Sequence, residues 1–490
     1  MQVTSTLAQA LNRRNDIASM QSQMADLNRQ LTTGLKSDSY AGLGTDRNLV
    51  LSLKGQVSAY DSYAKTIATT QLRIKTMSDT LTRVNDIARG MQTDGLTADF
   101  DLVNGSQTAQ QTGAAMNLDE LVSLMNLSVE DRQLFGGRDT QTTPVVLPDL
   151  MLNGDTTHAG LKQVIDERRV ADMGSDGLGR LVFSSTGAGN VTLGEDGSAF
   201  GFKFAAVNSS LTGATVTGPT GAPASVGVDF GATLPNPGES LSFDMTLPDG
   251  TTTTVSLKAT TATPAGEGEF TIGNDAASTT ANFQSALDGA LKTEAQTTLR
   301  AASSVQAANE FFDNNPPLRV DGTGNGLVAG TPQNTVIWYQ GDSSGTPGNN
   351  IVAQVGDGQQ VAYGARADQA ALRDTIKSAA LLSAVEYSSS DVNASASYKA
   401  LQTRVSDKLS FKNEQSVQDI VTDLGLKSSL IEQTKTRQDN LKSMAQGLLD
   451  ETQSADPYEV SVKITTLQTQ LEASYSVTSM VSKLNLVNYL

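Results

Sequence analysis

The strongest constraint on this chain is a long apolar pattern with helical spacing between Leu49 and Met91. Apolar residues recur there every three or four positions, and Gln, Thr, Lys and Asp fill most of the positions between them. This periodicity is typical of a helix that buries one face. A helix of about 45 residues would be about 70 Å long, which is more than the diameter of an ordinary domain. The pattern therefore predicts a rod-like helical element.

A separate apolar stripe occupies each end of the chain. The N-terminal stripe has the alternating three–four spacing of a helix packed on other helices, and it stops at Gly34 before a loop through Gly42. Near the other end, the string SADPYE predicts the start of a helix, with Asp456 as its N-cap, Pro457 as its first residue and Glu459 as the return partner of a capping box. The stripe residues are Ile17, Met20, Met24, Leu27 and Leu31 at the front, and Ile464, Leu467, Leu471, Val477, Val481 and Leu484 at the back.

Three further helical segments are predicted. One covers Asn117–Leu134 and ends at Gly136, since glycine commonly follows the last turn of a helix. A second lies within residues 279–312. A third begins near Ala367 and continues, past a weak point at Gly425, to the SADPYE break.

Between residues 138 and 364 the composition shifts to Gly, Thr, Ser and Pro, with short alternating runs. In SLSFDMTLPDGTTTTVSLKAT, apolar residues alternate with Ser and Asp before a Pro-Asp-Gly turn, which predicts a β-hairpin. Shorter strands are expected at RLVFSS, AFGFKFAAV and NTVIWYQGD.

These patterns predict an α+β fold: a discontinuous all-α coiled-coil rod, built from the N- and C-terminal helices, with an inserted β-rich outer region of one or two domains. The expected parts are the terminal helices (1–44 with 454–490), the rod (45–137 with 365–453) and the outer region (138–364), within which 236–313 is a candidate subdomain. At 490 residues the chain is long enough for several domains.

Composition excludes some classes of function. The 52 acidic and 35 basic side chains give a net charge of −17, which disfavours nucleic-acid binding because phosphate contacts need clustered Lys and Arg. No cysteine is available for disulfides or thiolate metal sites. We also expect no membrane span and no cleavable signal peptide, because the long apolar runs that these need are missing.

A search for chemistry predicts no catalytic, cofactor-binding or metal site. His158 is the single histidine, and its setting in NGDTTHAG favours a surface loop over catalysis. The string VDGTGNG resembles a calcium loop, but Pro332 stands where such a loop needs a bidentate Glu. VIDERRV is read as a solvated helix face. Trp338 and Tyr339 could form a sugar-stacking platform, although a half-buried strand is the commoner fate of such a pair.

The terminal stripes allow two interpretations. A three–four stripe is usually an internal packing face, and the simpler reading is a helical bundle closed within one chain. However, one helix from each end gives only a two-stranded contact, which is marginal by itself. This favours neighbours from other subunits and makes the stripe residues the candidate self-assembly surface.

Several strings resemble the flagellin and hook-associated axial protein family of the bacterial flagellum. LNRQLTTGLKSDSYAGLGTDRNLVLSLKGQVSAYDSYAKT is similar to the family's N-terminal signature, in which a turn and a small-residue loop precede the rod helix. The stretch differs from flagellins where Ser39, Tyr40 and Ala41 replace an Asp-Asp-Ala-Ala run. LFGGRDTQTTPV, TVIWYQGD, VAYGARADQAALR and LNLVNYL resemble segments of the family's hook–filament junction proteins.

The resemblance implies a structural, non-enzymatic protein without cofactors that joins hook to filament. It implies extracellular assembly as a homo-oligomeric ring, partners that include flagellin, hook-associated protein 1 and an export chaperone, and type III export. In the family, the loop after Gly34 is a spoke between the inner helix and the rod, which makes Gly34, Gly42, Asp456 and Pro457 the expected spoke and turn residues. Two alternatives stay open: a flagellin filament subunit, and a surface glycan- or ligand-binding flagellin homologue with Trp338 as its aromatic candidate.

Overall fold

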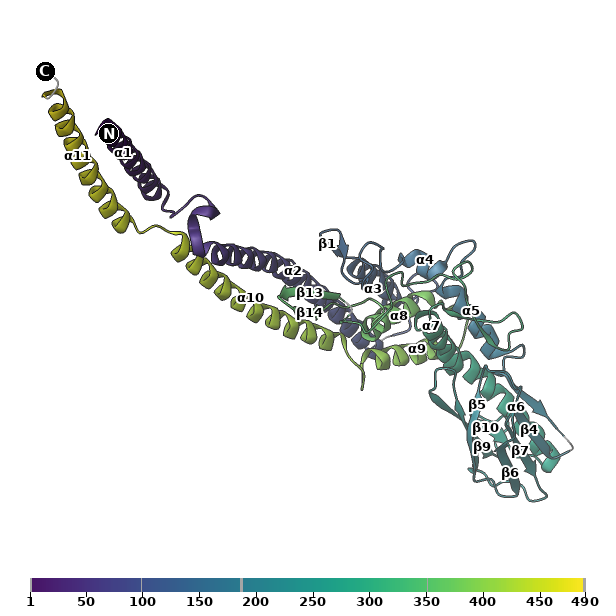
Figure 1. Ribbon diagram of the computed structural model, residues 1–490. Helices are drawn as coiled ribbons and strands as arrows, with labels where there is room; N and C mark the ends of the chain where they lie inside the picture. Colours follow the sequence, from purple (N-terminus) through teal and green to yellow (C-terminus); the bar gives the residue numbers. More distant parts are fainter. Residues whose placement is uncertain (1, 98, 186–187, 350, 488–490) are drawn as a thin grey trace. The chain divides into compact units, whose positions relative to one another are not determined.

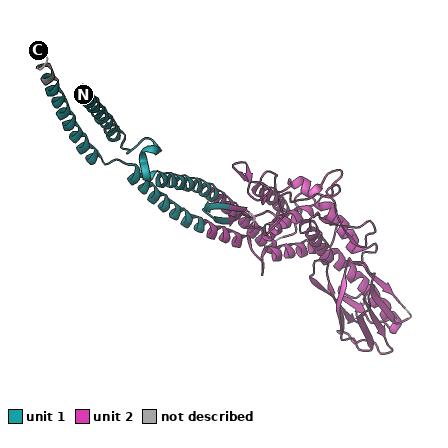
Figure 2. Cartoon of the chain, in the orientation of Figure 1, with its two compact units in different colours: residues 1–71, 353–361, 429–490 teal, residues 72–352, 362–428 magenta. Residues whose placement is uncertain are grey.

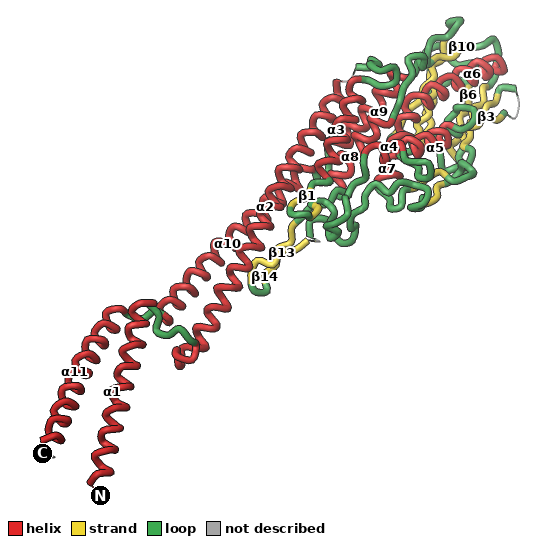
Figure 3. Tube along the Cα trace, turned by 90° about the horizontal axis from the view of Figure 1, so that it is seen from above, coloured by secondary structure: helices red, strands yellow, loops and turns green. Residues whose placement is uncertain are grey.

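The computed structural model describes residues 2–97, 99–185, 188–349 and 351–487, and the chain forms two compact units. Unit 1 comprises residues 1–71, 353–361 and 429–490, and unit 2 comprises residues 72–352 and 362–428 (Figure 2). Long helices occupy both ends of the sequence and a β-rich region lies in its middle, so the predicted α+β class is confirmed (Figures 1 and 3).

The predicted long helix is α2, which has 51 residues. The helices are α1 Gln2–Thr33, the 3-10 helix η1 Tyr40–Asp46, α2 Arg47–Thr97, α3 Ala109–Met125, α4 Pro148–Asn153, α5 Leu161–Met173, α6 Ala276–Glu294, the π-helical turn η2 Ala295–Leu299, α7 Arg300–Phe312, α8 Ala370–Ala384, α9 Ala394–Leu409, α10 Val417–Gln453 and α11 Pro457–Val487. The strands are β1 Ser128–Val129, β2 Arg132–Gln133, β3 Leu181–Ser184, β4 Asn190–Glu195, β5 Lys203–Ser209, β6 Ala214–Thr220, β7 Ser225–Phe230, β8 Ser240–Thr246, β9 Thr252–Thr260, β10 Glu269–Thr271, β11 Leu318–Val320, β12 Leu327–Ala329, β13 Ile351–Gly356 and β14 Gln359–Tyr363.

In unit 1, the first part of α2 packs against the last part of α10. Val50 and Leu53 form a buried cluster with Ala445 and Leu449. Each helix therefore has one buried apolar face, as its three–four apolar spacing predicts. A salt bridge of 2.7 Å from Lys442 Nζ to Asp61 Oδ1 lies beside this contact.

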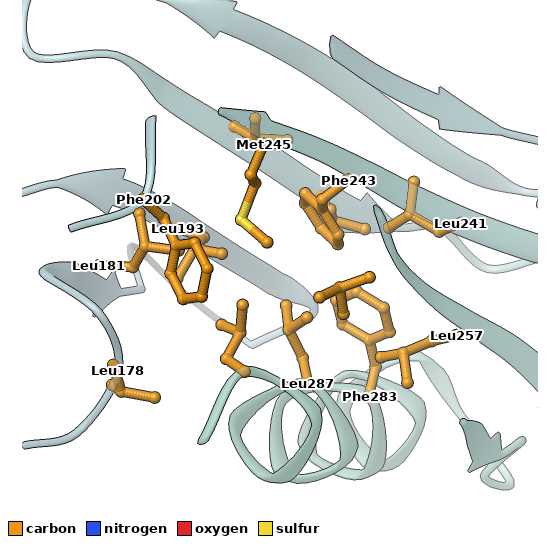
Figure 4. Close-up of a cluster of buried hydrophobic side chains, with 14 of the residues drawn as sticks. Leu178, Leu181, Leu193, Phe202, Leu241, Phe243, Met245, Leu257, Phe283 and Leu287 are labelled. Carbon is orange, nitrogen blue, oxygen red and sulfur yellow. The ribbon is translucent and has the colours of Figure 1, made fainter. Parts of the chain in front are cut away.

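In unit 2, β3–β10 form two four-stranded sheets with the orders β3-β4-β7-β6 and β10-β9-β8-β5. The predicted hairpin is β8–β9, in which Thr246 pairs with Thr252 across the Pro-Asp-Gly turn. Every second residue of β8 is buried, and these side chains meet Phe283 and Leu287 of α6 (Figure 4). One core joins residues 178–230 to residues 241–302, so segment 236–313 shares its core with the strands before it.

The rest of unit 2 is mainly helical. α3 packs on α8, and α7 packs on α5, α8 and α9. Two expectations are wrong here. α3 begins and ends about nine residues before the predicted 117–134, because Thr108 and Gln111 form a capping box. NTVIWYQGD forms no regular strand; it makes single bridges, Thr335 with Ala159 and Tyr339 with Val145.

Candidate assembly surface

The helices at the two ends of the chain, α1 and α11, lie side by side in unit 1 (Figures 1 and 3). Gln21 Nε2 donates a hydrogen bond of 2.8 Å to the hydroxyl of Tyr475, which joins residues 454 positions apart in the sequence. The pair encloses a groove of about 400 Å³, and its apolar lining includes Leu27, Leu467 and Val462. The contact is therefore a two-helix contact, with part of each predicted stripe on its inner side.

The predicted stripe residues fall into two groups. Leu471 is buried, and Ile17, Met20, Met24, Leu27, Ile464 and Leu467 are half-buried. The others face solvent: Leu31 is 45% exposed, Val477 50% and Val481 39%. The side chain of Leu484 lies outside the described residues, although its backbone is part of α11. A single subunit thus covers only part of its terminal stripes.

Further apolar residues of this helix pair are exposed. Leu11 on α1 and Val462 and Met480 on α11 are each about half or more exposed. The prediction missed them, and it also missed Val460, which is buried. Val460 precedes Ile464 by four positions, so the same spacing could have identified it.

The linker that follows α1 and the linker that precedes α11 are bonded to each other. α1 ends at Thr33, and the next residue, Gly34, has a φ of +71°, the left-handed conformation that favours glycine after a helix C-terminus. The backbone N–H of Lys36 donates to the carbonyl of Gln453 at 2.8 Å, and that of Ala455 donates to the carbonyl of Gly34 at 2.8 Å. Lys36 Nζ also donates to the carbonyl of Thr452 at 2.9 Å, at the end of α10.

The other spoke residues shape the same connection. Gly42 lies in η1, where a Cβ atom would stand 2.2 Å from Ser37 Oγ. α11 begins at Pro457, and the carboxylate of Asp456 accepts hydrogen bonds from the backbone N–H of Tyr458 at 2.8 Å and of Glu459 at 3.4 Å. The expected reciprocal bond from Glu459 is replaced by its salt bridge to Lys463 at 2.6 Å.

Two of the strings that the sequence singled out for possible chemistry form turns. His158 stands in a turn with Asp155, whose carboxylate accepts hydrogen bonds from the backbone N–H of Thr157 and His158 at 2.8 Å each. These bonds hold the pKa of Asp155 well below its usual range. The VDGTGNG string is likewise a turn around Asp321.

Trp338 cannot be a sugar-stacking platform. It is buried, its ring packs at 5.2 Å from that of Phe312, and its Nε1 donates to the Phe312 carbonyl at 3.0 Å. Neighbouring Tyr339 is buried as well. A ring with no exposed face cannot stack on a sugar, so the glycan-binding alternative loses its aromatic candidate.

The solvated-face reading of VIDERRV is wrong for one residue. Arg168 is buried, and it forms salt bridges with two buried carboxylates, Asp172 at 2.7 Å and Glu310. Its guanidinium also lies 4.8 Å from the ring centre of Phe200. Burial raises the pKa of Glu310 above its usual value, although Arg168 opposes this. The cluster connects α5 to α7.

Within the described ranges, no group of three or more His, Cys, Asp or Glu side chains is arranged to hold a metal ion. Among the same residues, no helix combines the length and apolarity required to cross a membrane.

Comparison with known proteins identifies the C-terminal segment. Residues 413–490 match the family model of the bacterial flagellin C-terminal helical region. The match begins just before α10 and includes α11. No curated protein matches the sequence. The match covers the last 78 of the 490 residues, so these C-terminal helices are similar to those of bacterial flagellins.

Proposed function

We propose that this chain, whose C-terminal helices match the flagellin family, is a hook–filament junction protein of the hook-associated protein 3 type. It assembles as a homo-oligomeric ring between hook-associated protein 1 and flagellin. An export chaperone delivers it to the type III channel of the flagellum, and it functions outside the cell. It has no enzymatic activity and no cofactor.

The observation that carries a role in self-assembly is the incomplete burial of the α1–α11 pair. Leu31, Val477 and Val481 remain exposed on helices whose other described stripe residues are buried or half-buried. Burying an apolar side chain of this size contributes about 1.5–3 kcal/mol, so covering them against neighbouring subunits favours assembly. The junction role rests on the resemblance of LFGGRDTQTTPV, TVIWYQGD, VAYGARADQAALR and LNLVNYL to segments of hook–filament junction proteins.

The proposed role assigns a task to each part of the chain. Residues 1–44 and 454–490 pack with neighbouring copies in an inner tube, 45–137 and 365–453 form the rod, and 138–364 form the outer region. A pair of helices that touch mainly each other is marginally stable. We therefore expect the monomer's terminal helices to gain order when neighbours cover their apolar edges.

A deletion strain tests the function. Loss of the protein should leave hooks without filaments and shed flagellin into the medium, which electron microscopy and immunoblotting can detect. Re-expression of the full chain should restore filaments. Filaments of normal number on the deletion strain would contradict the junction role.

Amide hydrogen exchange tests the coupling of order to assembly. In the monomer, α1 and α11 should exchange much faster than the buried part of α2, and assembly should slow them. Strong protection of both terminal helices before assembly would contradict this coupling.

A flagellin filament subunit is the second candidate, and the flagellin family match favours it. Seeded polymerisation separates the two. Purified chain added to hook or filament seeds should stop after a short cap if it is a junction protein, whereas a filament subunit should continue to grow long polymers.

A further inference from the structure

The outer β domain, residues 181–294 from β3 to α6, is joined to the helical part of unit 2 by an unusual helix. α6 and α7 form one continuous helix that is interrupted by the π-helical turn η2. α6 places Phe283 and Leu287 in the β core, while α7 packs on α5, α8 and α9. The π turn thus lies where the helix passes from the β domain to the helical part. Single π turns inside α-helices often mark functional sites.

One edge of the outer β domain is held by many bonds. Arg180, just before β3, donates from Nε to the carbonyl of Ala171 at 2.5 Å and from NH2 to the carbonyl of Gly324 at 2.6 Å. The backbone N–H of Gly201 donates to Asp172 at 2.8 Å. Asp172 belongs to the buried cluster of Arg168, so this edge is tied firmly to α5.

The turn between β8 and β9 contacts α9 mainly through one side chain, that of Arg404. Arg404 Nε lies 2.6 Å from Asp249 Oδ2, and Arg404 NH2 donates to Thr251 Oγ1 at 3.0 Å. Both charged side chains are largely buried. Beside them is a cavity of about 390 Å³, whose apolar lining includes Val305 and Leu381. The turn is therefore held mainly by one ion pair rather than by close apolar packing.

We propose that the Asp249–Arg404 pair is a releasable latch, and that the π turn at Ala295–Leu299 is the pivot on which the outer β domain swings when the latch opens. The Arg180 edge stays fixed during this motion, because it retains its bonds to α5 and to the 324–325 loop. The cavity provides room beside the turn, so opening breaks the ion pair while sacrificing little apolar contact. The proposal is independent of the junction role.

Spin-label distance measurements on the full chain test the latch. The natural sequence has no cysteine, so introduced cysteines are the only labelling sites. One pair, Ser256→Cys on β9 and Lys399→Cys on α9, spans the latch at exposed positions. A second pair, Val182→Cys on β3 and Val170→Cys on α5, spans the fixed edge, again at exposed positions.

Two variants remove the latch by different routes. Asp249→Asn keeps the shape and removes one charge, and Arg404→Met removes the other. In both, the Ser256–Lys399 distance distribution should broaden or gain a second peak, while the Val182–Val170 distribution should stay as in the parent. Glu167→Gln, which removes the partly buried ion pair between Glu167 of α5 and Arg319 of β11, is the matched control and should change neither.

An unchanged Ser256–Lys399 distribution in both latch variants would overturn the proposal. Equal broadening of both label pairs would also overturn it, because that result describes general loosening and not a swing about the π turn. Circular dichroism melting of each variant checks that the chain is folded, and either latch variant alone suffices if the other does not fold.

Discussion

Leu471 and Val477 lie six positions apart on α11, yet Leu471 is 9% exposed and Val477 is 50% exposed. Leu471 is covered within a single subunit, and Val477 is not. Substitutions at these two positions can therefore test separately the stability of the terminal helix pair and its capacity to bind other copies.

Leu471→Ala should weaken the α1–α11 pair in the monomer. Truncating a buried leucine lowers the free energy of unfolding by about 2–5 kcal/mol, and the lower end applies here because only two helices form the contact. Faster amide exchange in both α1 and α11 is the expected result. Exchange that is unchanged in α1 would show that the pair does not depend on this contact.

Val477→Ala should leave monomer stability within about 0.5 kcal/mol, because the side chain is already exposed. Assembly should suffer instead. The removed methyl groups account for about 1.5 kcal/mol if a neighbouring copy covers them, which corresponds to about a tenfold higher critical concentration for assembly. Sedimentation at a series of concentrations measures it, with Leu471→Ala as the comparison variant.

Gly34→Ala should destabilise the end of α1 by about 1–2 kcal/mol, because the residue has a left-handed conformation that a Cβ atom disfavours. No atom stands within 4 Å of that Cβ, so the cost is conformational and not steric. Gly55→Ala is the control: it lies at an exposed position of α2, and the same substitution should stabilise by up to about 1 kcal/mol. Local amide exchange near each site reports the opposite signs.

Glu310 should make stability depend on pH. Its folded-state pKa is raised by burial, so the folded chain holds the proton more tightly than the unfolded chain. The resulting stabilisation is fully present below the ordinary glutamate pKa and is lost as the pH rises through the folded-state value. Denaturant unfolding over that pH range measures the slope.

Substitutions in the same cluster check the cause. Glu310→Gln should flatten the slope and cost little at neutral pH, since it leaves Arg168 paired with Asp172 alone. Arg168→Met should cost about 3–5 kcal/mol, because it strands two buried carboxylates. Equal pH slopes in the parent chain and in Glu310→Gln would assign the dependence to another group.

The sequence predicted best what neighbouring residues decide. α2, the β8–β9 hairpin and the start of α11 at Pro457 follow from apolar spacing, a Pro-Asp-Gly turn and an N-cap, each contained in a short window. The start of α3 had a comparable signal in the Thr108–Gln111 capping box. It was missed because the first turns of that helix are rich in Ala, Gly and Gln and show little apolar period.

Contacts between distant residues were beyond such reasoning. VIDERRV has the composition of a solvated helix face, and nothing near it indicates that Arg168 meets Glu310, 142 positions later. Trp338 packs on Phe312, the last residue of α7, which lies 26 positions earlier in the sequence. In the candidate assembly surface, spacing identified which residues form the stripes, but only the packing of α1 on α11 distinguishes covered from exposed members.

The backbone bonds between residues 34–36 and 453–455 make the two ends of the chain share one register. An extra residue inserted into either segment alone would displace one helix along the other by up to about 3.5 Å and misalign every facing pair beyond it, including Gln21 with Tyr475. Matched insertions in both segments would keep that alignment. Changes in the length of the two connectors are thus tolerated together or not at all.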